Sequence, residues 1–353
     1  MYLQRIKVFI SFEGYYRKIY MRNFLFILFS FNLFGQNEVC FEIEPNPMQN
    51  VPGFAYFTKY VNVLNCIDVF AESSISDEKV LHAAAIAAEL LDNDEDGEVD
   101  DLNLKNQLSS SGALMPIFSS EWSQAANSFF NNYDGDGVSA VLFNNEIDPS
   151  NPGHWGDDAS VEEILHTINH VGHVEIFPDV FGLNPNSSIM SNAMDIARGG
   201  QFLNVPDQYP EEAWYHYDDW TCDYQCMAIE YLYWCIVSYM GILDDIATCN
   251  GIDNEWELCT PELFQTTDVI MYSVLDNFEY MLPQLAPDGN YCPSNIINGD
   301  INEDSIVNIL DIILIVNMIL GFSDETQNAD LNDDNLVDVL DIIVLVNIIL
   351  GVN

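Results

Sequence analysis

Two segments near the C-terminus share one pattern of hydrophobic and polar positions. DINEDSIVNILDIILIVNMILG, residues 300–321, aligns without gaps to DLNDDNLVDVLDIIVLVNIILG, residues 330–351. Each segment begins with polar residues at alternate positions and continues into a run that is apolar on most faces of a helix. Such a helix needs a partner to cover it, and its own duplicate is the natural partner. The repeat predicts a small all-α domain at residues 295–353.

The pattern is less regular upstream. DEKVLHAAAIAAELL, residues 77–91, predicts an alanine-rich helix, and NNYDGDGVSAVLF, residues 131–143, predicts a turn that leads into a strand. Elsewhere between Cys40 and Cys292, helical and irregular segments alternate with few strand signals. We expect one mainly α domain at residues 37–294, with an α+β domain as the alternative.

An apolar segment near the N-terminus has the pattern of an export signal. MRNFLFILFSFNLFGQ, residues 21–36, combines a positive charge with an apolar run of about twelve residues, which is short for a membrane span. Residues 1–20 are interpreted as an upstream extension, so residues 1–36 are set apart from the folded chain. No later segment predicts a membrane span. We expect a secreted or cell-surface protein.

The charge of the chain narrows the range of partners. The sequence has 56 acidic and 9 basic residues, and residues 37–353 keep only four of the basic ones. A surface this negative repels phosphate backbones and anionic lipids, so nucleic acid is not an expected partner. Cations are expected ligands. The eight cysteines of an exported chain favour disulfides, and zinc binding by Cys222 and Cys226 is the alternative at that pair.

The two C-terminal repeats place oxygen-bearing groups at loop positions 1, 3, 5, 9 and 12, with a backbone carbonyl at position 7. A hard cation such as Ca²⁺ takes six to eight oxygen ligands, and this spacing directs alternate side chains to one point. The predicted ligands are Asp300, Asn302, Asp304, Ile306, Asn308 and Asp311, then Asp330, Asn332, Asp334, Leu336, Asp338 and Asp341.

On these residues the C-terminal segment resembles a type I dockerin, the module that docks secreted glycan-degrading enzymes onto cohesin domains. The resemblance implies two bound calcium ions, a three-helix fold and a cohesin-like or other surface-docking partner. The segment departs from the family pattern where small hydroxyl residues are usual. It has Ile309 and Leu310 there in the first repeat, and Val339 and Leu340 in the second.

A third acidic loop, DNDEDGEVDDLN, follows the predicted alanine-rich helix. It has the spacing of an EF-hand loop, with glycine at the sharp-turn position and asparagine at the closing position where glutamate is usual. The predicted calcium ligands are Asp92, Asp94, Asp96, Glu98, Asp100 and Asn103. An acidic solvated turn without metal is the alternative.

The central segment VEEILHTINHVGHVEIF offers a second type of metal site. Glu162, His166, His170 and His173 follow one another at helical spacing, so their side chains share one face. Two histidines at i and i+4 present two nitrogens to one zinc ion, as in the H-E-x-x-H motif of zincin metallopeptidases. The resemblance is partial, because Thr167 stands where that motif has its catalytic glutamate.

Glu163, one turn earlier, is the candidate catalytic base. A second cluster, AWYHYDDWTCDYQCMAIEYLYW, offers His216 and Glu230 as further ligands among aromatic residues, a composition typical of a ligand cleft. The hypothesis is a zinc-dependent hydrolase with ligands drawn from Glu162, His166, His170, His216 and Glu230. The alternatives are a polysaccharide-degrading glycoside hydrolase and a non-catalytic, calcium-stabilised surface or matrix protein whose histidines are ordinary helix residues.

Overall fold

The computed structural model describes residues 41–293, 299, 301–302, 307–323, 326, 329–332 and 336–350. Several predicted features lie outside the described residues: the N-terminal leader, Cys40, and the loop positions Asp300, Asp304, Ile306 and Asp334.

The central domain contains a five-stranded mixed sheet in the order β1-β2-β3-β4-β5. The strands are β1 (Glu44–Pro45), β2 (Phe57–Val63), β3 (Ile67–Glu72), β4 (Leu114–Phe118) and β5 (Leu142–Phe143). The first three strands pair antiparallel, whereas β4 runs parallel to both β3 and β5. The strand predicted after the turn at residues 131–143 corresponds to β5.

The central domain is therefore α+β, which was the alternative to the mainly α prediction. The sequence did not indicate these strands, because they are short and their apolar and polar residues do not all alternate. In β4, LMPIF, all five side chains are buried, and a short apolar run of this kind cannot be distinguished from a buried helix by periodicity. In β3, four of six positions are buried, so the polar face that would mark a strand is missing there too.

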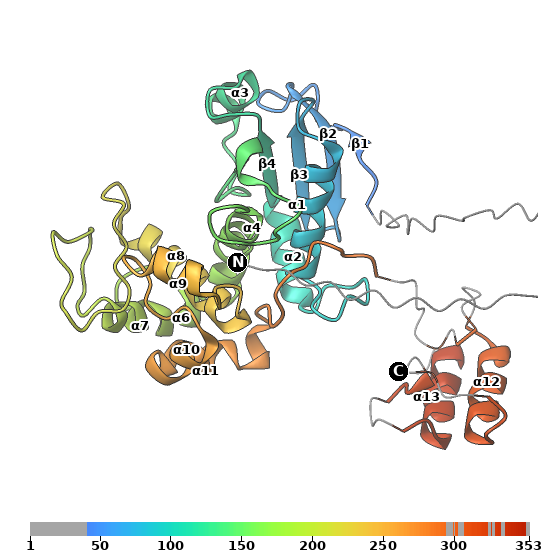
Figure 1. Cartoon of the computed structure of the whole chain (residues 1–353). Helices are drawn as coiled ribbons and strands as arrows, with labels where there is room; N and C mark the ends of the chain where they lie inside the picture. The colour runs from blue at the N-terminus through green and yellow to red at the C-terminus, as the bar shows by residue number, and fades with distance from the viewer. Residues whose placement is uncertain are drawn as a thin grey trace, which may run out of the picture. The chain divides into compact units, whose positions relative to one another are not determined.

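The remaining regular elements of the central domain are helical, and loops connect them (Figure 1). The α-helices are α1 (Asp77–Glu89), α2 (Leu102–Ser111), α3 (Gln124–Asn132), α4 (Ser160–Ile168), α5 (Val174–Ile176), α6 (Pro178–Phe181), α7 (Ile189–Ala197), α8 (Tyr224–Met240), α9 (Ile246–Ile252), α10 (Pro261–Thr267) and α11 (Val269–Leu275). The other helical turns are η1 (Asn144–Glu146), η2 (Asn169–His173) and η3 (Phe278–Tyr280).

Two helices lie at the centre of this arrangement. The predicted alanine-rich helix is α1, which starts at the N-cap Ser76 and packs against β2, β3 and α4. Its small side chains allow this close packing on several sides. Helix α8 is apolar nearly all round, as expected for a buried helix, and packs against α4, α7, α10 and α11. Helix α4 thus lies between α1 and α8, the position that matters for the site.

The C-terminal region contains α12 (Ile309–Ile319) and α13 (Val339–Leu350), which pack against each other as the repeat predicted. Their small core includes Ile315 of the first repeat and Leu345 of the second, at equivalent positions thirty residues apart. Both side chains are fully buried. The two repeats therefore cover each other's apolar faces.

Disulfides join Cys222 to Cys226 and Cys249 to Cys259, while Cys66 and Cys235 are buried free thiols. The expectation of disulfides is confirmed for these two pairs, and the Cys222–Cys226 bond removes the alternative of zinc binding at those thiolates. Among the described residues, no helix combines the length and the apolar character needed to cross a membrane.

Candidate metal centre

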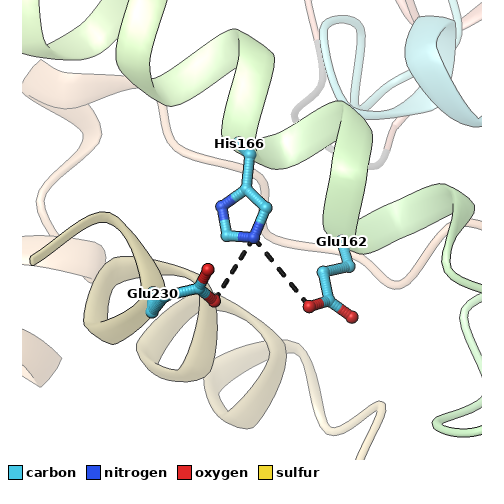
Figure 2. A group of neighbouring side chains, drawn as sticks. All are labelled: Glu162, His166 and Glu230. Carbon is cyan, nitrogen blue, oxygen red and sulfur yellow. Dashed lines mark ion pairs between the residues drawn. The ribbon is translucent and has the colours of Figure 1, made fainter. Parts of the chain in front are cut away.

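Three side chains from two helices meet at one point in the central domain (Figure 2). Glu162 and His166 lie one turn apart on α4, and Glu230 faces them from α8. Nε2 of His166 lies 3.4 Å from a carboxylate oxygen of Glu230 and 3.9 Å from one of Glu162. One ligand atom from each of the three lies within 4.8 Å of the others, a spacing that could hold a metal ion.

The start of α4 is fixed by a buried carboxylate. Asp158 accepts hydrogen bonds from the Ser160 hydroxyl at 2.7 Å and the Gly153 N–H at 2.8 Å. It also lies 2.9 Å from Nε2 of His82, which is on α1. These contacts tie the first turn of α4 to α1 and so set the position from which Glu162 projects.

The other end of α4 continues without a break into the π-helix η2. Gly172 lies there against α2, where a Cβ atom would come within 2.4 Å of Leu104. A larger residue here would require the end of the Leu104 side chain to move, and π-helical turns inside helices often occur at functional sites. The packing against α2 therefore holds the helix that carries His166 from its C-terminal side.

Helix α8 is anchored at its first turn. The Asp223 carboxylate caps the helix by accepting hydrogen bonds from the N–H groups of Gln225 and Cys226, both at 3.1 Å. The Cys222–Cys226 disulfide links this turn to the preceding loop. Glu230 comes one turn after Cys226, so cap and crosslink both restrain its position.

The three-residue group combines two carboxylates with a single imidazole. Burial by itself lowers the pKa of His166, but the charge of Glu230 and the contact with Glu162 outweigh burial and raise the pKa well above its usual range. His166 is 6% exposed. A buried imidazole that holds a proton only because two carboxylates face it is a group whose proton a divalent cation can replace.

Glu163 lines the same cavity, whose volume is about 380 Å³. Burial raises the pKa of this carboxyl to about 8, with His166 opposing the rise and Glu162 and Glu230 adding to it. Behind the centre, burial and the charge of Glu230 raise the pKa of Glu255 to about 7, although a hydrogen bond from Trp234 Nε1 at 3.0 Å lowers it. The centre thus lies among carboxyl groups that repel one another.

The other predicted zinc ligands lie outside this three-residue group. His170 lines the cavity and contacts the Ser139 hydroxyl at 2.9 Å through Nδ1. His216 lies 3.9 Å from Glu257 and packs against Tyr209. His173, which the helical spacing placed on the same face, is fully buried and contacts Asn169 instead. The π-helical turn changes the spacing after residue 168, so helical periodicity did not place His173 correctly, whereas His170 still lines the cavity with His166.

The acidic loop after α1 is tightly turned. Three of its predicted calcium ligands, Asp92, Asp94 and Asp100, have carboxylate oxygens within 4.8 Å of one another. Asp92 is buried and accepts hydrogen bonds from the Gly97 N–H at 2.8 Å and the Tyr291 hydroxyl at 2.6 Å. Tyr291 was not predicted at this loop, because nothing in the sequence indicates a contact between residues 199 positions apart.

The other predicted ligands of this loop, Asp96, Glu98 and Asn103, make separate contacts. Asp96 accepts a hydrogen bond from the Glu98 N–H at 2.8 Å, and the Glu98 side chain lies 3.3 Å from Lys105. Asn103 lies in the first turn of α2, where its N–H bonds to the helix cap Asp101 at 2.7 Å. The roles of Asp96, Glu98 and Asn103 as calcium ligands stay predictions.

The two C-terminal loops are closed in the same way. Asp311 is fully buried and accepts hydrogen bonds from the N–H groups of Ile301 at 2.9 Å and Asn308 at 2.8 Å. The equivalent Asp341 is also fully buried and accepts them from Leu331 at 2.8 Å and Asp338 at 2.7 Å. In both repeats, the carboxylate at position 12 thus bonds to the backbone at loop positions 2 and 9.

Comparison with known proteins identifies one part of the chain. Residues 298–350 match the model of the dockerin type I domain, which agrees with the two equivalent loops and the paired helices. No curated protein and no solved structure matches the chain.

Proposed function

We propose that this chain, whose residues 298–350 form a type I dockerin domain, is a secreted, calcium-binding, metal-dependent hydrolase. The dockerin domain implies calcium binding, a cohesin partner and an extracellular setting. The catalytic part of the proposal concerns the central domain. It is supported by one observation, the convergence of Glu162, His166 and Glu230 beside Glu163 in a single cavity.

The order of these residues along α4 also supports the proposal. This order is not apparent when His166 is taken as the first ligand. If Glu162 is taken as the first ligand, the segment reads E-E-I-L-H, with ligands at i and i+4 and Glu163 directly after the first. That is the spacing of the zincin motif with glutamate in place of its first histidine. Glu230 would supply the third protein ligand that a catalytic zinc requires.

The donor set suits a divalent ion of intermediate hardness. Two carboxylates and one imidazole are compatible with Zn²⁺ and also with Mn²⁺. Of these we propose Zn²⁺, because a three-ligand set that leaves a position open is typical of catalytic zinc. When bound, such an ion supplies a Lewis acid that polarises a carbonyl group and lowers the pKa of water.

The side chains of the cavity would then have two roles, metal binding and proton transfer. Glu162, His166 and Glu230 bind the ion, and their two negative charges offset its charge. Glu163 accepts a proton from the attacking water and returns it to the leaving group. Burial raises the pKa of Glu163 to about 8 in the metal-free protein. A divalent cation bound by the neighbouring residues would lower this pKa and favour the ionised form that a general base requires.

Metal titration of the full chain tests this proposal. After removal of metals and saturation with Ca²⁺, calorimetry should detect one further Zn²⁺ site. Glu230→Gln should weaken Zn²⁺ binding at least tenfold, because it removes a charged ligand. Glu163→Gln should keep Zn²⁺ and reduce hydrolysis of a mixed peptide library about 10²- to 10⁴-fold.

Glu257→Gln is the matched control, because Glu257 is exposed and lies outside the three-residue group. It should bind Zn²⁺ as the wild type does. Absence of any Zn²⁺ or Mn²⁺ site beyond the calcium sites would refute the proposal and favour a non-catalytic, calcium-stabilised protein. Equal Zn²⁺ affinity in Glu230→Gln and wild type would refute the assigned ligands.

We further propose a calcium ion in each dockerin loop and a third in the loop at residues 92–103. The third site is supported by the three converging carboxylates and by Gly97, whose φ of +94° provides the sharp turn at loop position 6. For docking we propose a cohesin-like partner with an apolar contact surface. Ile309, Leu310, Val339 and Leu340 replace the usual small hydroxyl residues, and all four are exposed.

A further inference from the structure

The rim of the cavity contains a rigid carboxylate with only one of its two oxygens engaged in hydrogen bonds. Asp223 lines the cavity and is exposed to solvent. Both N–H groups that it caps bond to the same oxygen, Oδ1. The cap and the neighbouring Cys222–Cys226 disulfide hold the side chain in place, while Oδ2 receives no hydrogen bond within the described chain. A fixed acceptor therefore faces the solvent at the mouth of the site.

Among the described residues, no lysine or arginine side chain lines the cavity to neutralise this carboxylate. Within the described residues, the four Lys and Arg side chains are all engaged elsewhere. Lys59 pairs with Asp77, Lys79 bonds to the Asn144 carbonyl, Lys105 pairs with Glu98, and Arg198 is fully buried and bonds to the Phe202 carbonyl. The remaining imidazole of the cavity wall, His170, has its pKa lowered by burial and is neutral at pH 7.

Electrostatics then limits the substrate. A divalent ion is offset by Glu162 and Glu230, so Asp223 remains a net negative charge at the cavity mouth. Anionic groups such as carboxylates, sulfates or phosphates are repelled there, whereas an ammonium or guanidinium group is attracted. The cavity is thus complementary to a substrate with a positive charge near its reacting bond.

The spacing along α8 favours a peptide. Asp223 precedes Glu230 by seven residues, which is about 10 Å along a helix axis. An extended peptide advances about 3.3 Å per residue, and lysine and arginine carry their charge at the end of a long flexible stem. A basic side chain within one or two positions of the reacting bond can therefore span from the metal centre to Asp223.

We propose that Asp223 forms the subsite for a lysine or arginine side chain of a peptide substrate. This inference rests on the proposed hydrolase function. It deepens that function by naming the substrate class, and it identifies Asp223 as a specificity-determining residue.

Binding of matched peptides tests the inference without depending on turnover. The full chain carrying Glu163→Gln, loaded with Zn²⁺ and Ca²⁺, is titrated with fluorescent alanine-rich hexapeptides that contain one arginine or one citrulline, its neutral counterpart. At physiological salt we expect the arginine peptide to bind about three- to tenfold more tightly. Adding Asp223→Asn should reduce this ratio to about one. Asparagine caps helices as well as aspartate does, so α8 is expected to remain intact.

Asp245→Asn is the matched control for the overall negative charge. Asp245 caps α9 through the same type of bonds, to Ala247 and Thr248, and does not line the cavity. This variant should keep the preference for arginine. An unchanged preference in Asp223→Asn, or no preference in the starting protein, would overturn the inference. So would preferential binding of a glucosamine tetramer over the arginine peptide, which would indicate an amino sugar instead.

The outcome is separable from that of the hydrolase proposal. Zn²⁺ titration of the same samples reports on Glu162, His166 and Glu230 independently of any peptide. Absence of Zn²⁺ binding, with the arginine preference retained, would refute the metal centre alone. Zn²⁺ binding without an arginine preference would refute the Asp223 subsite alone.

Discussion

The imidazole of His173 is fully buried in η2, and its Nδ1 lies 3.0 Å from Oδ1 of Asn169. Burial lowers the pKa of His173 to about 4, with a smaller opposing effect of Asp101. In the unfolded chain the pKa returns to its ordinary value near 6.5. Between these two values the unfolded chain binds a proton that the folded protein does not, so the free energy of unfolding decreases as the pH falls.

We therefore predict that His173 makes the protein acid-sensitive. Between pH 6.5 and 4 its contribution should reduce the free energy of unfolding by about 1.4 kcal/mol per pH unit, to a total of at most about 3 kcal/mol. Urea denaturation across this range should show a shallower decline for His173→Gln than for wild type. His154→Gln, which changes a half-exposed histidine, should decline as wild type does. Parallel curves for His173→Gln and wild type would contradict the prediction.

The sequence indicated which residues could be ligands of the metal centre, but not which of them lie together in the fold. Glu162, His166 and Glu230 were all among the proposed ligands, but so were His170 and His216. The spacing within α4 relates Glu162 to His166, whereas no sequence pattern relates either of them to Glu230 on a different helix. The carboxylate of Asp223 escaped notice because it looks like any helix cap until the cavity beside it is known.

At the level of elements, the duplicated helices were the easiest part to predict. Their identical register identifies the partner of each helix, since both copies have the same apolar pattern. The sheet of the central domain was the hardest. Its strands are short and mostly buried, and the parallel pairing of β3 with β4 requires a crossover through α1 and α2 that no local pattern reveals.

The paired helices should depend on calcium. Asp311 and Asp341 are fully buried carboxylates, and removing a cation beside them leaves two desolvated negative charges under α12 and α13. We predict that the calcium-selective chelator EGTA reduces the far-ultraviolet circular dichroism of the full chain by the share of these helices, which have 11 and 12 residues. Added Ca²⁺ should restore it. The same signal with and without EGTA would rule out calcium-dependent folding of this domain.

At the scale of the whole molecule, the chain combines an α+β domain with a dockerin domain, and both contain acidic loops suited to calcium. We predict three calcium ions per chain, counted by elemental analysis after equilibration with micromolar Ca²⁺. Asp94→Asn should reduce the count to two, because Asp94 belongs to the group of three carboxylates in the loop at residues 92–103. Asp94 is exposed, so its replacement leaves the core intact. Asp134→Asn, in the acidic turn before β5, should leave the count at three. A count of two in wild type would exclude the loop at residues 92–103.

The end of the central domain folds back onto the last residue of α1 and onto that same loop. The N–H of Gln284 bonds to Asn93 at 2.7 Å, the N–H groups of Gly289 and Asn290 bond to Glu89 at 3.0 and 2.9 Å, and the Tyr291 hydroxyl bonds to Asp92. Tension applied to the chain beyond Pro293, such as the pull of a docked partner in flowing medium, would reach these bonds before any strand of the sheet. An ion that stiffens the loop would then also strengthen the mechanical anchor of the tether.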